Sequence, residues 1–150
     1  MMKIKFFEKD GRLNPEAIYA GVYQFSIGVQ ENTEDSSLPL YIGESYSMLS
    51  RCSNHLYEIF HTDPSYFGLT KENLEDERLQ LIVDIYVDKH ERIYLPDGIS
   101  NSDRDILLRS KEKSAIEERH PLSQNSTNDN LRKDRVEIVQ DAIRSLFADK

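Results

Sequence analysis

The sequence predicts a small α/β (α+β) protein in which a three-stranded, mainly antiparallel sheet is flanked by helices. Runs rich in β-branched and aromatic residues predict strands over 20–29, 38–42 and 79–87. Patterns with helical spacing lie between and after these runs, which predicts helices that cover the sheet. The length of 150 residues suits one domain, 1–150, with a core of its own.

The N-terminal third predicts short elements and one hairpin. Residues 3–7 are expected to form a short strand, and Asn14-Pro15 is expected to begin a brief helix before Gly21. The polar stretch 30–37 joins the next two strands as a loop longer than the two to five residues typical of hairpins.

Capping residues and apolar stripes predict the helices. Ser45 or Ser47 is expected to cap the first long helix, and Ser102 or Asp103 the next. Residues 121–130 are polar and predict a loop, after which 131–148 predicts a C-terminal amphipathic helix. The expected helices cover about 48–60, 71–77, 102–119 and 131–148.

The charge balance bears on the kind of partner. With 27 acidic and 19 basic residues, the net charge is −8. Contacts with phosphates normally need clustered Lys and Arg, so this balance argues against tight, nonspecific wrapping of DNA. A local basic site stays possible, and a divalent cation would offset part of the repulsion.

The lack of an expected membrane helix or secretory signal, together with the single cysteine, predicts a cytoplasmic protein. No apolar stretch approaches the roughly 18 residues of a membrane helix, so no membrane partner is expected. The first ten residues lack the apolar core of a secretory signal. Cys52 is the single cysteine and has no internal disulfide partner, which fits a reducing compartment.

Two tripeptides carry the chemical information. Gly21-Val22-Tyr23 and Tyr41-Ile42-Gly43 lie in the paired strands, Arg51 follows eight residues after Gly43, and His55 follows four after Arg51. The guanidinium is a planar fork that matches a phosphate, and the spacing of four puts the histidine on the same helix face. Two phenols with these groups form a set suited to hydrolysing a phosphodiester.

A carboxylate for a metal must come from elsewhere in the chain. Glu112, between Lys111 and Lys113 on the helix expected over 102–119, is the best candidate. Glu117 and Glu118 compete with it.

Together these residues resemble the GIY-YIG nuclease family. The match consists of GVY, a gap, YIG, then the arginine and the histidine. It continues in the run 111–116 with Pro121 and Asn125, which resembles the glutamate helix of that family. The similarity covers 20–125, the nuclease-like core of the expected domain.

The resemblance implies a metal-dependent endonuclease that hydrolyses DNA phosphodiester bonds. Tyr23 would be the general base or its hydrogen-bond partner, Tyr41 would orient water and phosphate, and Arg51 would stabilise the growing charge. His55 would assist at the phosphate or carry a proton. Glu112 would bind one divalent cation, Mg²⁺ or alternatively Mn²⁺.

The remaining expected site residues would serve the substrate. Gly43 would leave space where backbone meets substrate, Asn125 would fix the loop that closes the site, and Lys111 and Lys113 would bind substrate. Four other tyrosines are interpreted as packing residues: Tyr57, Tyr66, Tyr86 and Tyr94.

The sequence also departs from the family pattern. The gap between the tripeptides is long, and Glu44 places a negative charge beside the expected phosphate. The family asparagine often lies three residues after the proline, whereas Asn125 lies four after it, which leaves Asn128 and Asn130 as alternatives. A catalytically inactive binding or regulatory protein of the same fold is therefore the alternative function.

Oligomerisation is a further open expectation. A homodimer could present both strands of a duplex to two sites, with the apolar stripe of 136–147 as a contact. Packing of that stripe on the chain's own sheet explains it equally well and is the preferred interpretation.

Overall fold

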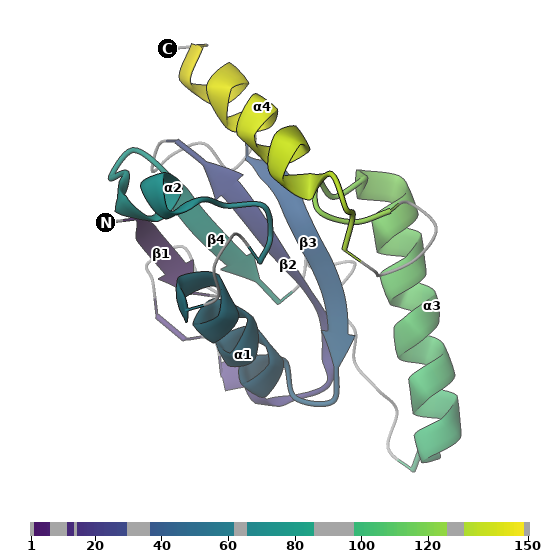
Figure 1. Cartoon of the computed structure of the whole chain (residues 1–150). Helices are drawn as coiled ribbons and strands as arrows, with labels where there is room; N and C mark the ends of the chain where they lie inside the picture. The colour runs from purple at the N-terminus through teal and green to yellow at the C-terminus, as the bar shows by residue number, and fades with distance from the viewer. Residues whose placement is uncertain are drawn as a thin grey trace.

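Four strands form one sheet in the computed structural model, which describes residues 2–6, 12–13, 15–29, 37–61, 66–85, 98–125 and 131–148. The order is β1-β4-β2-β3 (Figure 1). Strand β2 is antiparallel to both β3 and β4, and β1 is parallel to β4. The bounds are β1 Lys3–Phe6, β2 Gly21–Gly28, β3 Leu38–Ser45 and β4 Gln80–Asp84.

The expected three-stranded antiparallel sheet is therefore present as β3-β2-β4, and the short first strand extends it by one parallel neighbour. Strand β3 is longer than expected because its pairing with β2 continues past Gly43. The last pair in this register is Gly21 opposite Ser45. The expected loop at 30–37 falls largely outside the described residues, as do Tyr86 and Tyr94.

Strand β2 is the centre of the core. All eight of its residues are buried, as expected of a strand with neighbours on both sides and helices over the sheet. Alternation sends Tyr23, Phe25 and Ile27 into the main apolar cluster, whereas Val22 joins a second, smaller cluster.

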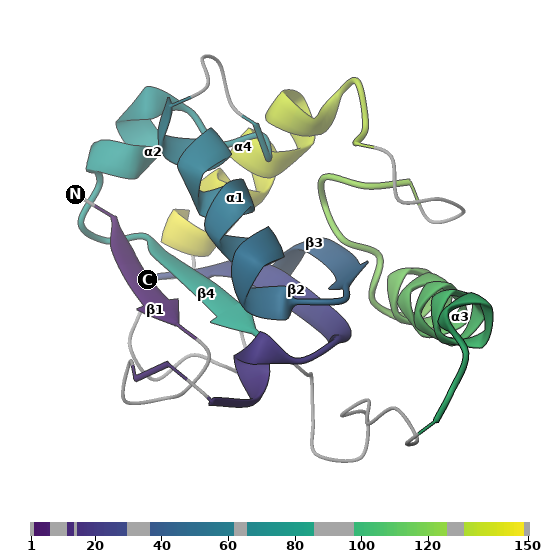
Figure 2. The same ribbon diagram turned by 90° about the horizontal axis from the view of Figure 1, so that it is seen from below.

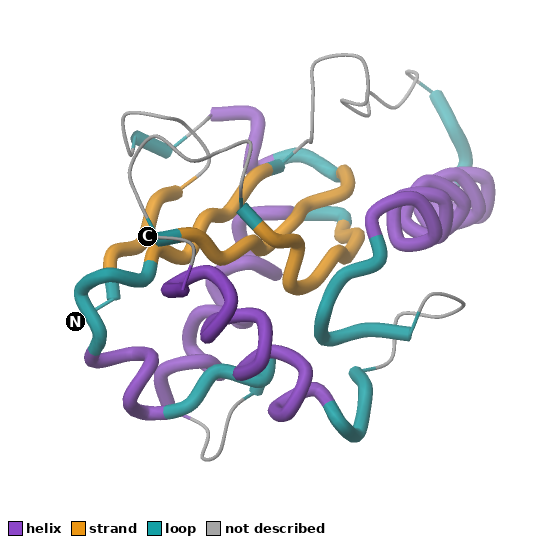
Figure 3. The backbone as a smooth tube through the Cα atoms, turned by 90° about the horizontal axis from the view of Figure 1, so that it is seen from above, coloured by secondary structure: helices purple, strands orange, loops and turns teal. Residues whose placement is uncertain are grey.

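Helices cover the sheet unequally. Helices α1 (Met48–His61), α2 (Lys71–Glu75) and α4 (Arg135–Ala148) lie over one face of the sheet (Figures 2 and 3). Helix α3 (Asn101–Arg119) lies beside β3, where Ala115 and Ile116 pack with Val22 and Ile42. The edge strand β3 thus lies between α1 and α3.

Local hydrogen bonds explain where the helices begin. The Ser47 hydroxyl accepts from the Ser50 amide at 3.4 Å, so Ser47 caps α1, one of the two expected caps. The expected caps of α3 are wrong, because the Ser100 hydroxyl accepts from the Asp103 amide at 3.1 Å and the helix starts at Asn101. Before β2, the brief expected helix is the 3₁₀ turn Pro15–Ile18.

The chain after α3 turns back along the edge of β3. His120 ends the helix in the left-handed region (φ 50°), and Pro121 follows it. The amides of Leu122 and Ser123 then donate to the carbonyls of Pro39 and Leu40, each at 3.0 Å. The start of the expected 121–130 loop is therefore bonded to the sheet and covers part of its exposed edge.

The C-terminal helix packs on its own chain. In α4, Val139 and Ile143 are buried in the main cluster, and the Phe147 ring lies under the Arg78 guanidinium at 3.8 Å. The apolar stripe of α4 thus packs against the protein's own core, which agrees with the preferred interpretation of packing within the chain. None of the helices in the described ranges is long and apolar enough to cross a bilayer.

Candidate active site

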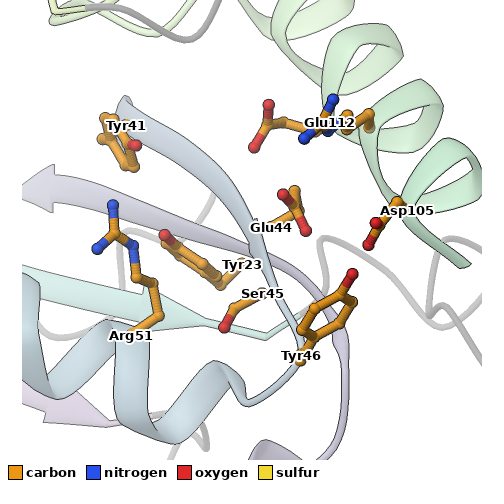
Figure 4. Close-up of a pocket in the computed structure, with 9 residues that line it drawn as sticks. Tyr23, Tyr41, Glu44, Ser45, Tyr46, Arg51, Asp105 and Glu112 are labelled. Carbon is orange, nitrogen blue, oxygen red and sulfur yellow. The ribbon is translucent and has the colours of Figure 1, made fainter. Parts of the chain in front are cut away.

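A pocket of about 370 Å³ lies between strand β3, the first turn of α1 and helix α3 (Figure 4). Four of the expected site residues, which come from four separate elements, line it together: Tyr23, Tyr41, Arg51 and Glu112. The other lining residues are Glu44, Ser45, Tyr46, Asp105 and Arg109.

The position of Tyr23 depends on Gly43. The two residues lie opposite each other on β2 and β3, and the tyrosine ring covers the glycine. A Cβ on residue 43 would lie 2.3 Å from the Tyr23 hydroxyl oxygen and 2.5 Å from its Cζ. The space that the resemblance assigned to substrate at Gly43 is therefore filled by Tyr23.

Tyr41 is fixed from behind by another ring. It lies two residues before Gly43, on the same face of β3, and its ring stacks on Phe67 with centroids 4.5 Å apart and planes 15° apart. The Tyr23 ring centroid is 6.4 Å away, at 30°. The two phenols thus stand side by side at one wall of the pocket.

His55 lies beneath the pocket and does not line it. Its side chain is 1% exposed, and its Nε2 lies 2.7 Å from the Tyr23 hydroxyl oxygen. On the other side, Nδ1 lies 3.2 Å from the Tyr66 hydroxyl oxygen. The interpretation of Tyr66 as a packing residue is therefore incomplete, and His55 can act on a substrate only through Tyr23.

The charge of Arg51 orients this hydrogen-bond chain. The guanidinium favours a negative Tyr23 oxygen, because its positive charge lowers the pKa of that phenol. A lone pair of the Tyr23 oxygen therefore faces Arg51, and its proton points to Nε2 of His55. A neutral imidazole then carries its proton on Nδ1 and donates it to the Tyr66 oxygen.

Burial keeps the groups below the pocket neutral. It raises the pKa of the Tyr23 phenol, as does the neighbouring Tyr41, while the Arg51 guanidinium acts in the opposite direction. Burial also lowers the pKa of His55 to about 3, and the charge of Arg51 adds to this effect. Burial raises the pKa of Cys52 as well, so its thiol is not suited to attack a substrate.

One face of α3 points into the pocket. Asp105, Arg109 and Glu112 are spaced by four and three residues, which aligns them along the helix. Our sequence analysis missed Asp105 and Arg109, although their spacing from Glu112 was the signal for them. Lys111 and Lys113, expected to bind substrate, are exposed and are not among the residues that line the pocket.

The three candidate glutamates differ in position. Glu112 is 8% exposed and lines the pocket, whereas Glu117 and Glu118 are exposed and do not line it. Glu44 lines the pocket, so the negative charge expected beside a phosphate is indeed at the site.

An amide side chain closes the loop after α3, but it is not that of Asn125. Buried Gln124 accepts from the Ile42 amide and donates to the Ile42 carbonyl, both at 2.8 Å, while Asn125 is exposed. Gln124 lies three residues after Pro121, the spacing that the resemblance gives for an asparagine. That spacing was a signal for this position, but we searched it for an asparagine and not for a glutamine.

The acidic groups of the pocket limit how a metal ion would be held. Within the described ranges, no three His, Cys, Asp or Glu side chains are grouped so that they alone form a metal site. Mg²⁺ is commonly bound by one or two carboxylates, with water and substrate phosphate as the other ligands. Glu112 in an open pocket fits that kind of binding.

We compared the chain with models of protein families, with curated proteins and with solved structures, and none of them matches it. The resemblance to the GIY-YIG family thus stays a prediction that rests on a few residues and on their placement in the pocket.

Replacing Gly43 with alanine is expected to lower the free energy of unfolding by about 1–3 kcal/mol, because the new Cβ would force the Tyr23 ring out of place. Urea denaturation measures this. Gly21→Ala is the matched control, since its Cβ would meet only the flexible end of Met48. Equal losses of unfolding free energy in the two variants would contradict the close packing of the Tyr23 ring on Gly43.

Gln124→Ala is expected to cost about 1–3 kcal/mol or more of unfolding free energy, since it leaves the amide and the carbonyl of Ile42 without their buried partner. Asn125→Ala should change stability by less than about 0.5 kcal/mol because that side chain is exposed. Thermal or urea unfolding compares them, and a larger effect of the Asn125 variant would reverse our assignment.

Acid should destabilise the protein through His55. The pKa is about 3 in the fold and 6.5 in the unfolded chain, so between these values the unfolded chain binds a proton that the folded protein does not. The free energy of unfolding should fall by up to about 1.4 kcal/mol for each pH unit below 6.5. His55→Gln should remove this part of the slope, measured by urea denaturation at several pH values.

His61→Gln is the control for that titration. His61 is exposed at the end of the same helix, and the acid slope of its variant is the reference with which that of the His55 variant is compared. An unchanged slope in the His55 variant would show that His55 is not the group that titrates.

Proposed function

We propose that this protein is a metal-dependent endonuclease that hydrolyses DNA phosphodiester bonds on a GIY-YIG-like fold. The observation that supports this most directly is the convergence of Tyr23, Tyr41, Arg51 and Glu112 from separate elements on one pocket. Each group supplies something that phosphodiester hydrolysis requires, and an accidental occurrence of the two tripeptides would give no reason for them to meet.

The two guanidiniums would hold the phosphate. Arg51 and Arg109 enter the pocket from α1 and α3, on different sides of it. Each presents a planar pair of donors that matches two phosphate oxygens, and together they would stabilise the charge that grows in the transition state.

Tyr23 would handle the proton of the attacking water. Burial disfavours its phenolate, so a simple base role is costly. Its oxygen can instead take a proton from the water while its own proton passes to Nε2 of His55, along the existing 2.7 Å hydrogen bond. Because the pKa of His55 is about 3, the ring would return that proton readily.

Tyr41 and Glu112 complete the proposed machinery. The Tyr41 hydroxyl would orient water and phosphate from its fixed position on Phe67. The Glu112 carboxylate would hold one divalent cation, Mg²⁺ or Mn²⁺. When bound, the cation would neutralise phosphate charge and stabilise the leaving 3′ oxygen.

One observation favours the alternative of a catalytically inactive binding or regulatory protein. Glu44 and Asp105 line the same pocket as the proposed phosphate ligands, and the net charge is −8. Carboxylates near a phosphate raise the cost of binding it unless cations compensate. The one cysteine is buried and unpaired, which is consistent with a reducing, cytoplasmic location. Such a location is compatible with either function.

The nuclease proposal predicts nicking of supercoiled plasmid by the purified protein with Mg²⁺ or Mn²⁺, read on agarose gels. Arg51→Ala and Glu112→Gln should each slow nicking roughly 100-fold or more, because they remove transition-state charge stabilisation and the cation ligand. Glu117→Gln, an exposed change on the same helix, should retain the wild-type rate.

The pattern across these variants separates the functions. Equal nicking by the Arg51, Glu112 and control variants would point to a contaminating nuclease and contradict the proposal. Absence of cleavage of both plasmid and single-stranded DNA by a folded wild-type protein with either cation would favour the inactive alternative.

A further inference from the structure

An exposed aromatic ring stands at the mouth of the pocket. Tyr46 lies in the turn between β3 and α1, lines the pocket with Arg51 and Asp105, and is 47% exposed (Figure 4). Its ring is not needed by the apolar core, since it belongs to neither buried cluster. The expected nuclease residues do not include it.

The ring is held in place from two sides. The Arg104 guanidinium of α3 lies over it at 3.9 Å from the ring centroid, a cation–π contact that covers one face. The turn itself is fixed by the Ser45 hydroxyl, which accepts from the Ser47 amide at 3.1 Å and donates to the Ser47 carbonyl at 2.9 Å. Tyr46 is thus a preset flat surface with little freedom left to lose on binding.

A flat π surface beside guanidiniums suits a nucleotide. Arg51 and Arg109 offer phosphate ligands in the same pocket, and a base linked to a neighbouring phosphate would reach the ring. Stacking of a base on an aromatic side chain tolerates any sequence, because every base has a π face. This step rests on the proposed function, which places a DNA phosphate in the pocket.

Stacking and charge both indicate that this base is unpaired. In an intact duplex each base already stacks on both neighbours, so its face cannot contact Tyr46. The carboxylates of Glu44 and Asp105 also line this pocket, which disfavours the dense double row of phosphates of a duplex. A single strand carries fewer phosphates per unit length and offers free base faces.

We propose that Tyr46 stacks on an unpaired base next to the scissile phosphate, so that the preferred substrate of this site is single-stranded DNA. Arg104 acts as a positioning residue that holds the ring from behind. The pocket then binds a phosphate through guanidiniums and a base through the tyrosine.

The chain provides a closely matched control in Tyr57. This residue is 59% exposed on α1, and one of its faces is covered by His61, with ring centroids 4.2 Å apart and planes 12° apart. Tyr57 is thus also an exposed tyrosine with one ring face covered, but it is not among the residues that line the pocket.

The test measures binding of a fluorescein-labelled single-stranded oligonucleotide and of its duplex by fluorescence anisotropy. The full chain carries Glu112→Gln to prevent cleavage, and salt is held constant. We expect tighter binding of the single strand, a roughly 5- to 150-fold loss with Tyr46→Leu, and near-normal binding with Tyr46→Phe and Tyr57→Leu. Circular dichroism melting verifies that each variant is folded.

Several results would overturn this inference. They are equal binding by the Tyr46→Leu and Tyr57→Leu proteins, duplex bound as tightly as single strand, or no binding of either DNA. Cleavage of plasmid or of a labelled single strand by the chain with Glu112 intact decides the proposed function separately. Cleavage that depends on Arg51 and Glu112 but is indifferent to Tyr46 would remove the stacking role and leave the nuclease standing.

Discussion

The hydrogen bond between the Tyr23 hydroxyl and Nε2 of His55 is the interaction on which the site depends. It joins the central strand to α1 at a point where both side chains are buried. Because Arg51 lies one turn before His55, fixing the histidine also fixes where the guanidinium enters the pocket. A polar contact inside an apolar cluster has few acceptable geometries, so it specifies the packing of helix on sheet.

An acidic protein can still present a local site for an anion. The net charge of −8 is spread over the whole chain, whereas Arg51 and Arg109 reach one pocket from α1 and α3. Charges a few ångströms away outweigh those beyond a Debye length of about 8–10 Å. The carboxylates of Glu44 and Asp105, which line the same pocket, oppose this attraction.

Spacing along the chain predicted most of what is local and missed what depends on how elements meet. The strands and α1 followed from apolar patterns, whereas the resemblance to the GIY-YIG family implied that Tyr23, Tyr41, Arg51 and Glu112 meet. Tyr66 was missed because its hydrogen bond to His55 joins segments that only the tertiary fold brings together, and Gln124 because its bonds to Ile42 show its role more clearly than its spacing from Pro121 does. Asp105 and Arg109 share a helix face with Glu112, and that spacing points to the pocket only once Glu112 is known to face it.

The two tripeptides depend on each other because Tyr23 of the first occupies the space beside Gly43 of the second. The tyrosine of the first fills the space above the glycine of the second, as the 2.3 Å approach of a Cβ on residue 43 shows. A side chain at Gly43 would displace the phenol, and loss of the phenol would leave a cavity and an unpartnered His55 nitrogen. The site therefore fixes a handful of residues strictly while the surrounding positions need only keep their pattern of burial.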